Sequence, residues 1–340
     1  MTMTDLFGVD LPIVAAPMAG GPSGPGLVAA VTSAGGFGFL AAGYKQPAAV
    51  AAEMADLRTA GIPFGVNMFV PSGSPLAEAE FRRYARTIAG EGAPYGLDLA
   101  GAPLMSDDDH WAAKIDLLLA DPVPVVSFTF GGPSPDVVVA LRRAGSRVLV
   151  TVTSVDEARA AADADGLIVQ SSAAGAHSGT HDPARVLPET RLTDLIPQLR
   201  AATDQPLIAA GGLATASQLR DIVPLGADAV MVGTALLRTD ESGASQLHKD
   251  ALVDPVRTRT VITRAFTGRP ARGLLNGFIE RNEAFAPVGY PAIHHLTRPL
   301  RAAATQAGDA ERVSLWAGTG HRHARTGRAA DVIADLTALL

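Results

Sequence analysis

The sequence predicts an α/β protein, a TIM (β/α)8 barrel with an additional, mainly helical lid segment. Eight short runs of apolar and β-branched residues recur along the chain, and each is soon followed by Gly, Pro or Ser. Ala-rich segments with a helical period lie between these runs. Strands that alternate with helices form a parallel sheet, and eight such repeats close most naturally into a barrel. The length of 340 residues allows one such barrel with extra segments.

The predicted strands are short and apolar, as strands buried on both faces usually are. They span residues 13–16, 37–41, 64–69, 123–128, 148–152, 166–170, 207–210 and 229–232. The predicted helices span residues 26–33, 47–60, 76–89, 135–144, 154–164, 193–201 and 215–225. Gly145 and Gly226 each stand between a helix and the next strand, where the chain must turn through a left-handed conformation.

Two stretches do not fit the repeat. Residues 71–114 are too many for a single crossover, and they contain the acidic run 107–109, which we expect in a solvated loop or at a helix N-terminus. Residues 239–311 follow the last strand and are expected to be mostly helical, with 252–267 the most periodic part. We therefore expect the barrel to consist of residues 1–70, 115–238 and 312–340, and the two insertions to form a lid over its catalytic face.

The composition excludes several classes of function. The formal net charge is −6, and Lys and Arg are spread along the chain without the basic stripe of a nucleic-acid-binding protein. The chain contains no cysteine, which excludes disulfides, thiolate nucleophiles and Cys-ligated metals. Redox chemistry would therefore need an organic cofactor or a metal held by other ligands.

The uncharged stretch from residue 11 to residue 44 is not a membrane span. Glycines interrupt it repeatedly, and the first ten residues lack the basic region of a signal peptide. We expect a cytoplasmic protein with no membrane partner. The sequence leaves the oligomeric state open and is compatible with a homo-oligomer.

The ends of the last two predicted strands are rich in glycine. The seventh ends in Ala210-Gly211-Gly212, and the eighth is followed by Gly233 and Thr234. In barrels of this type the last two strand ends often bind a phosphate, because glycine lets the backbone approach the anion and a following helix N-terminus supplies free N–H groups. The alternative is that these glycines only form tight turns.

Other strand ends suit a flat ring. Ala16, Pro17 and Met18 form a rigid turn at the first strand end, where methionine makes an adaptable wall. Asn67 at the third strand end and Gln170 at the sixth carry amides that match the donors and acceptors at an isoalloxazine edge. The alternative for each amide is that it satisfies loop backbone groups.

His177 is the candidate catalytic residue. It follows Gln170 on a loop of small residues that includes Gly175, so its imidazole can project into a cavity and exchange a proton. The alternative is a loop histidine bonded to backbone. His181 is a candidate partner or second metal ligand, but Asp182 is the only carboxylate nearby and is not clearly placed as a third ligand, so we expect no metal site. The remaining histidine pairs, at 294–295 and 321–323, are expected on the surface.

Seven motifs together resemble one known family. They are residues 16–19 (APMA), 33–40 (SAGGFGFL), 65–67 (GVN), the loop that ends at His177, 209–212 (AAGG), 231–234 (MVGT) and 267–276 (TGRPARGLLN). The chain resembles the nitronate monooxygenases, formerly called 2-nitropropane dioxygenases, and the related flavin-dependent enoyl-acyl-carrier-protein reductases. The resemblance runs from residue 12 nearly to residue 320.

The resemblance implies non-covalent FMN with its phosphate at the last two strand ends and His177 beside the flavin. It further implies that FMN oxidises an alkyl nitronate and is reoxidised by O2, giving a carbonyl compound and nitrite. His177 would take the α-proton of a neutral nitroalkane or pair as imidazolium with a nitronate oxygen, and we expect its pKa near neutrality. The family loop usually reads Glu-Ala-Gly-Gly-His, whereas this chain has Ala173 and Ala176 at the first and fourth positions. These two changes leave the natural substrate open.

Two other functions stay open at this point. One is an NAD(P)H-dependent flavin reductase of a quinone or an enoyl thioester. The other is a flavin-free phosphosugar isomerase or aldolase, which is disfavoured because Lys45, Lys114 and Lys249 are the only lysines and none lies at a predicted strand end.

Overall fold

The computed structural model describes residues 7–71 and 76–340. Residues 1–6, expected in the barrel, and 72–75, expected in the first insertion, lie outside the described residues. Eight parallel strands form a closed barrel, which confirms the predicted fold class. Within the described ranges, every helix is too short or too polar to span a bilayer.

The barrel strands follow one another in chain order, and the last pairs with the first, where Met231 lies opposite Val14. Each lies within two residues of its predicted range. The strands are β1 Ile13–Ala15, β2 Phe37–Ala41, β3 Gly65–Phe69, β4 Val125–Thr129, β5 Arg147–Val152, β6 Gly166–Gln170, β8 Leu207–Ala210 and β9 Ala229–Val232.

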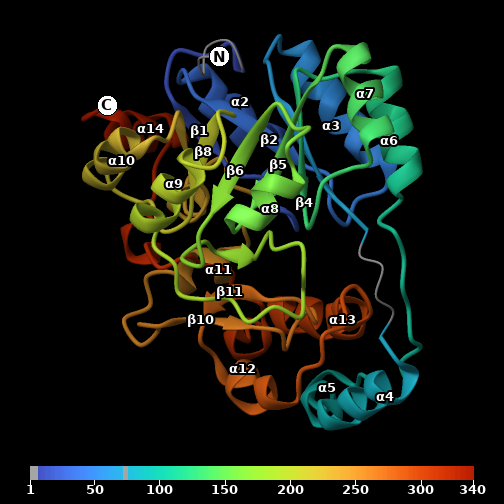
Figure 1. Ribbon diagram of the computed structural model, residues 1–340. Coiled ribbons are helices and arrows are strands. Elements are labelled where there is room, and N and C mark those ends of the chain that lie inside the picture. The colour runs from blue at the N-terminus through green and yellow to red at the C-terminus, as the bar shows by residue number, and fades with distance from the viewer. Residues whose placement is uncertain (1–6, 72–75) are drawn as a thin grey trace.

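Helices cover the outside of the barrel (Figure 1). They are α2 Pro25–Ser33, α3 Pro47–Thr59, α6 Trp111–Ala120, α7 Pro135–Ala144, α8 Val155–Ala160, α9 Leu192–Arg200, α10 Ala216–Ile222 and the C-terminal α14 Ala329–Thr337. Helix α14 packs against α2 and α10. Helix α6 was not predicted, because its N-cap residue His110 supplies no capping side chain that would mark a helix start. This helix crosses the boundary that we expected after residue 114.

The barrel interior is filled by side chains that alternate along each strand. Phe37 and Phe39 of β2 point inward, while Leu40 packs outward against the helices. Phe7 stacks on Phe37 with ring centroids 4.5 Å apart. Gly65 makes room for this layer, since a Cβ there would lie 2.4 Å from the Phe39 ring. The interior is therefore a packed core, and only the carboxyl ends of the strands are available for a site.

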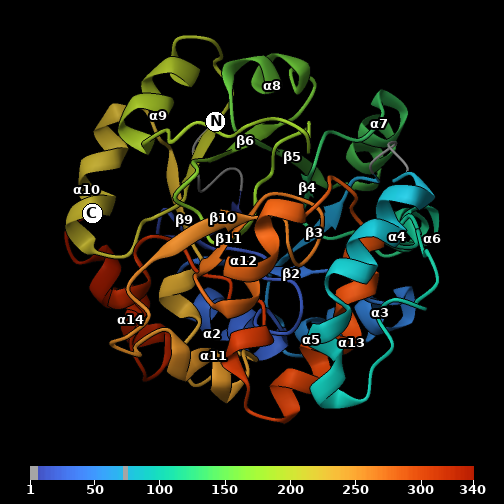
Figure 2. The same ribbon diagram turned by 90° about the horizontal axis from the view of Figure 1, so that it is seen from below.

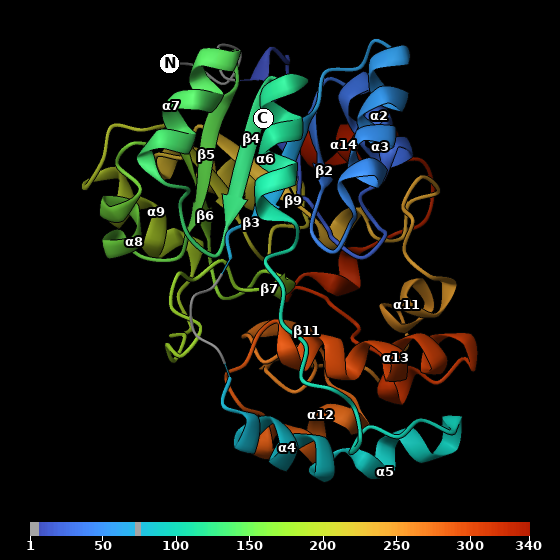
Figure 3. The same ribbon diagram turned by 90° about the vertical axis from the view of Figure 1, so that its right-hand side faces the viewer.

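The two insertions lie together beyond the carboxyl ends of the strands (Figures 1 and 3). Viewed from that side, they lie in front of the barrel (Figure 2). The Tyr84 hydroxyl donates to the Ala265 carbonyl at 2.7 Å and joins the first insertion to the second. The helices of this lid are α4 Glu78–Thr87, α5 Ala89–Gly92, α11 Gln246–Ala251, α12 Gly277–Asn282 and α13 Ala292–Gln306.

The lid also contains a β-sheet that the sequence did not predict. The helix expected over residues 252–267 is wrong, because the β-branched run Thr260–Thr263 forms β10 and pairs with β11, Ala271–Leu274. Strand β7, Ala176–His177, comes from the barrel loop after β6 and pairs with β11. The loop of the candidate catalytic histidine is thus joined to the lid by backbone pairing.

Short 3-10 turns complete the chain. They are η1 Ala93–Tyr95, η2 Val223–Leu225, η3 Thr234–Leu236, η4 Glu283–Phe285, η5 Ala310–Arg312 and η6 His321–His323.

Candidate active site

A cavity of about 700 Å³ lies between the barrel mouth and the lid. The residues that the sequence assigns to catalysis and cofactor binding all line it. These residues are Ala16, Pro17, Met18, Asn67, Gln170, Gly175, His177, Ala210, Gly211, Gly212, Gly233 and Thr234. The barrel topology therefore brings together residues from the first, third, sixth, seventh and eighth strand ends, as the strand assignment predicts.

The glycines after β8 have the backbone conformation that requires glycine. Gly211 and Gly212 have φ values of 117° and 75°. A Cβ on Gly212 would lie 2.9 Å from both the Ala173 Cβ and the Thr319 hydroxyl. Tight turns thus explain the glycines at these two positions without reference to a ligand.

The same turns also present backbone donors. Within the part of the chain that the structure describes, the N–H groups of Gly211, Gly212, Gly233 and Thr234 donate to no protein acceptor. Helix α10, which follows β8, begins with a capping box in which the Thr215 and Gln218 side chains bond to each other's backbone N–H groups.

The turn after β1 is held by a serine that the sequence analysis missed. The Ser23 hydroxyl donates to the Ala16 carbonyl at 3.0 Å and accepts from the Met18 N–H at 2.9 Å. It fixes the wall formed by Ala16, Pro17 and Met18. The signal was a lone serine between glycines and prolines, which is too common in loops to single out.

Both amides line the cavity and also bond to protein groups, and Gln170 takes the alternative role of satisfying loop backbone groups. Asn67 Nδ2 donates to the Ser127 hydroxyl at 2.9 Å and to the Thr129 hydroxyl at 3.0 Å. Gln170 accepts from the Gly179 N–H at 2.7 Å and donates to the His177 carbonyl at 3.2 Å. Gln170 therefore orders the loop that carries His177.

His177 lies inside a group of aromatic rings. Its ring centroid is 5.6 Å from that of Phe130, 5.7 Å from Tyr290 and 5.8 Å from Trp316. The preceding Ala176 has a φ of 63°, a left-handed conformation at the position where the family loop has glycine. The strand pairing of β7 with β11 holds this conformation in place.

The pKa of His177 is not near neutrality, so that expectation is wrong. Burial, together with the positive charges of Arg269 and Arg301, lowers the pKa of His177 to about 3. The imidazole is therefore neutral at pH 7. No local pattern indicates this lowered pKa, because both arginines follow His177 in the chain by about 90 residues or more.

The two arginines are cations without carboxylate partners. Neither forms an ion pair with Asp or Glu among the described residues. Arg269 is fully buried, its guanidinium carbon lies 3.8 Å from the Phe130 ring centroid, and its Nε and Nη1 have no hydrogen-bond partner. Arg301 lines the cavity and donates to His294. Such unpaired charges make the site favourable for an anion.

Several further cavity residues were missed. His294 was expected on the surface, but it is buried and stacks on Tyr44 with ring centroids 4.1 Å apart. His321 does not line the cavity, but it is also buried, so the expectation of a surface position is wrong for His321 too. The detectable signal was the spacing of His294, Arg298, Arg301 and Thr305, which places polar side chains on one face of α13.

The acidic run does not lie in a solvated loop throughout. Asp109 accepts from the Tyr44 N–H at 2.9 Å and pairs with the buried Lys114 at 2.8 Å. It thereby fixes the cavity wall at Tyr44. Lys45 also lines the cavity, and its ammonium group pairs with Glu53 at 2.6 Å.

His181 takes the backbone-bonded role. Its Nε2 lies 3.1 Å from the Thr151 carbonyl, and its N–H donates to Glu157. In the described ranges no three His, Asp or Glu side chains gather as metal ligands.

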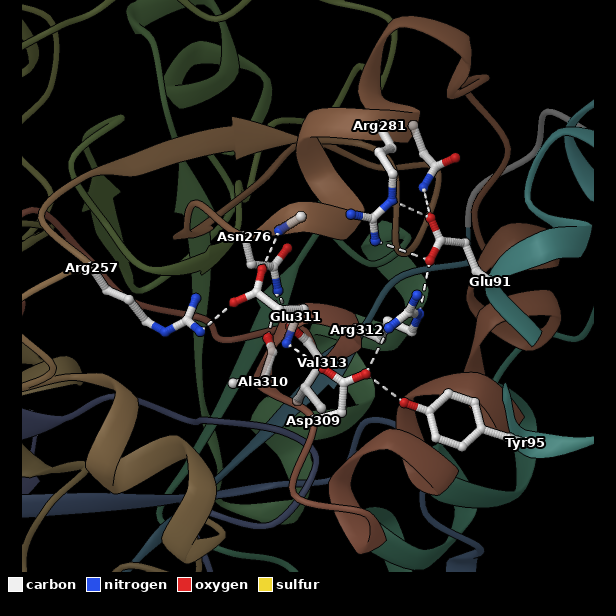
Figure 4. Close-up of polar contacts among 12 residues, drawn as sticks. Glu91, Tyr95, Arg257, Asn276, Arg281, Asp309, Ala310, Glu311, Arg312 and Val313 are labelled. Carbon is white, nitrogen blue, oxygen red and sulfur yellow. Dashed lines mark hydrogen bonds and ion pairs between the residues drawn. The ribbon is translucent and has the colours of Figure 1, made fainter. Parts of the chain in front are cut away.

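A polar network holds the segment that enters the cavity after residue 312 (Figure 4). Glu91 of the first insertion accepts from Arg281 at 2.7 Å and from Arg312 at 2.8 Å, and Arg312 also donates to Asp309 at 2.8 Å. Asn276 donates to the Val313 carbonyl at 2.9 Å. Both insertions therefore support the chain that carries Trp316 into the cavity wall.

Comparison with known proteins identifies the family of this chain. Residues 1–338 match the family model described as nitronate monooxygenase. The chain is 34% identical to a probable nitronate monooxygenase of Staphylococcus aureus (strain Newman), over 98% of this chain and 95% of the relative.

Two solved structures are similar to this chain over nearly its whole length. A nitroalkane oxidase from Streptomyces ansochromogenes superposes with a TM-score of 0.93 at 50% identity, covering 99% of this chain and 96% of that one. FabK from Thermotoga maritima superposes with a TM-score of 0.74 at 26% identity, covering 98% and 93%.

Proposed function

The chain belongs to the nitronate monooxygenase family of flavin-dependent oxidoreductases, and on that premise we propose that it uses FMN and O2 to oxidise alkyl nitronates to a carbonyl compound and nitrite. The observation that carries the proposal is the neutral His177 in a cavity lined by Arg301, with Arg269 buried nearby, neither arginine having a carboxylate partner among the described residues. The substrate class and the identity of the flavin are the parts proposed.

The cavity fits FMN in its donors and in its walls. The four unpaired N–H groups after β8 and β9 suit a phosphate, which binds to converging backbone donors. Ala16, Pro17 and Met18 supply a flat wall opposite Gly233, where a Cβ would come within 3.3 Å of the Ala16 Cβ. A bound flavin would supply the electron-accepting chemistry, which no side chain of this chain can provide.

The charges in the cavity favour an anionic substrate over a neutral one. A nitronate is an anion, and Arg301 in the wall and Arg269, which lies against the Phe130 ring, would attract it. Removal of the α-proton from a neutral nitroalkane would instead place an imidazolium beside these two cations. The same charges that lower the pKa of His177 disfavour that product.

His177 is still placed to assist either substrate. Once a nitronate is bound, its negative charge offsets the positive charges of the two arginines and raises the pKa of His177. The imidazole can then hold a proton that bonds to a nitronate oxygen. The aromatic rings around His177 lower the polarity of its surroundings, which strengthens that contact.

The test is anaerobic flavin reduction by nitronate, by neutral nitroalkane and by NAD(P)H, in the wild type and in His177→Asn. The purified protein should contain FMN, and nitronate should reduce it. His177→Asn should keep FMN and lower reduction by both nitro substrates, more for the neutral nitroalkane, which must lose a proton, than for nitronate. His181→Asn is the matched control, because His181 belongs to the same loop but bonds to backbone.

Three results would overturn the proposal. Release of FAD, or absence of flavin after incubation with FMN, would remove the cofactor assignment. Reduction by NAD(P)H without reduction by nitronate would favour the reductase of quinones or enoyl thioesters. An unchanged His177→Asn variant with both nitro substrates would remove His177 from the reaction.

A further inference from the structure

The lid places a threonine on the ring of His177. His177 Nε2 lies 2.9 Å from the Thr267 hydroxyl oxygen, and Thr267 is buried with 1% of its surface exposed. Thr267 belongs to the second insertion, between β10 and β11. The contact is therefore made across the junction of barrel and lid, next to the pairing of His177 with Ala271.

The Thr267 hydroxyl has one proton and two possible acceptors. One is the Arg269 carbonyl, 3.2 Å away, and the other is the Nε2 lone pair of His177. Within the described part of the chain, the Arg269 carbonyl accepts from no other group, and its residue is fully buried. A buried carbonyl left without a donor is costly, whereas His177 can donate instead of accept. The hydroxyl proton therefore goes to the Arg269 carbonyl.

This assignment determines the tautomer of the histidine. If the hydroxyl donates to Arg269, its oxygen can only accept from His177, so Nε2 must carry the imidazole proton. In the neutral ring, Nδ1 then holds the lone pair. Nδ1 makes no hydrogen bond to a described residue and is not enclosed by protein atoms. It belongs to a ring that lines the cavity, so it is open to a substrate there.

We propose that Thr267 is a positioning residue that keeps the His177 proton on Nε2 and leaves Nδ1 as the nitrogen that meets the substrate. Nδ1 is then the atom that takes the α-proton of a nitroalkane or holds a proton against a nitronate oxygen. The inference rests on the proposed function only for the identity of the substrate. The tautomer itself is a property of the protein alone.

The first test reads the tautomer directly. Histidine-selective 15N labelling of the flavin-loaded protein, with long-range proton–nitrogen correlation, distinguishes Nε2–H from Nδ1–H rings. The His177 signal is assigned by its absence in His177→Asn. The Nε2–H pattern is expected at pH 7, and an Nδ1–H pattern would overturn the inference whatever reaction the enzyme catalyses.

The second test removes the hydroxyl. Thr267→Val keeps the shape of the side chain but cannot accept from Nε2, so the ring should no longer hold a single tautomer. Reduction of the flavin by neutral nitroalkane should fall by about tenfold, the value of one neutral hydrogen bond. Thr267→Ser should restore both the signal and the rate. Thr263→Val is the matched control, because it removes an equally buried lid hydroxyl that donates to Glu283 and not to His177.

The outcomes separate this inference from the proposed function. An Nε2–H pattern in a protein that does not oxidise nitro compounds would reject only the proposed function. Nitronate oxidation with an unchanged tautomer and rate in a folded Thr267→Val would reject only the inference. If Thr267→Val does not fold, the wild-type spectrum and Thr267→Ser still decide the assignment.

Discussion

Replacement of Glu91 by Gln should loosen the attachment of the first insertion to the rest of the lid. The carboxylate of Glu91 accepts four hydrogen bonds, two from Arg281 at 2.7 and 3.0 Å, one from Asn282 at 3.1 Å and one from Arg312 at 2.8 Å (Figure 4). Glutamine retains one acceptor oxygen but turns an amide N–H2 group toward the arginines. The variant therefore loses both a charge and part of the geometry.

The magnitude follows from how exposed each partner is. The side chain of Glu91 is 9% exposed, that of Arg312 is 24% exposed and that of Arg281 is 49% exposed. The Arg281 pair counts as a surface pair of about 0 to 1 kcal/mol, and the more enclosed Arg312 contact contributes about 1.5 to 2 kcal/mol. The free energy of unfolding should fall by about 1.5 to 3 kcal/mol. With an unfolding entropy of about 0.7 kcal/mol/K for a chain of this length, Tm falls by about 2 to 4 °C.

The pH dependence of this effect has a definite sign. Burial alone would raise the pKa of the Glu91 carboxyl, but hydrogen bonds from Arg281 and Asn282 and the charges of Arg281 and Arg312 outweigh it and lower the pKa below its usual value of 4.5. A lowered pKa in the folded state gives stability that is present above pH 4.5 and is lost as the pH falls through the folded pKa. The gap in Tm between wild type and Glu91→Gln should therefore be largest near neutral pH and close in acid.

Thermal unfolding followed by circular dichroism at pH 7 and near pH 4 measures both effects. Glu80→Gln is the matched control, because Glu80 lies on the same insertion but faces an exposed Arg83 at 3.4 Å. A Glu91→Gln variant that melts within about 1 °C of the control at pH 7 would refute the reasoning, since a network of this geometry must then contribute no more than a surface pair.

Two further outcomes are expected. Gly212→Ala should lose flavin retention, because the φ of 75° and the close contacts at Gly212 leave no room for a Cβ. Gly226→Ala is the control: Gly226 has a φ of 111° on the turn before β9, so this variant should lose stability but keep flavin. Flavin content per folded protein after gel filtration measures the difference, and equal retention in the two variants would place the phosphate elsewhere. Burial lowers the pKa of His248 to about 4. Between pH 6.5 and pH 4 the unfolded chain therefore takes up a proton at His248 that the folded protein does not, so the free energy of unfolding decreases as the pH falls through this range. His248→Asn should flatten the dependence of Tm on pH there, and parallel curves for variant and wild type would contradict this assignment.

The barrel could be predicted from the sequence because its signals are local. Each strand is a short apolar run, and Gly145 and Gly226 mark the turns before β5 and β9. The rules of barrel topology then place every strand end on one face, so His177 and Gly212 could be assigned to the same site without any contact being known.

The lid could not be predicted in the same way. Strand β10 is β-branched but pairs with β11 and, through it, with a loop almost 90 residues earlier, so its register has no local signal. His294 was misassigned for a related reason. Its burial depends on stacking against Tyr44, a residue 250 positions away that belongs to the first part of the barrel.

The barrel and the lid contribute different parts of the site. The barrel supplies the glycine turns after β8 and β9, which suit a phosphate and say little about the substrate. The lid supplies Thr267, Arg269 and Arg301, which determine the charge around His177 and the nitrogen that it presents. A related barrel with a different lid would keep the cofactor site and change the charge at the reacting atoms. Substitutions in the lid should therefore change which nitro compound reacts, while substitutions at the strand ends should change whether the flavin is retained.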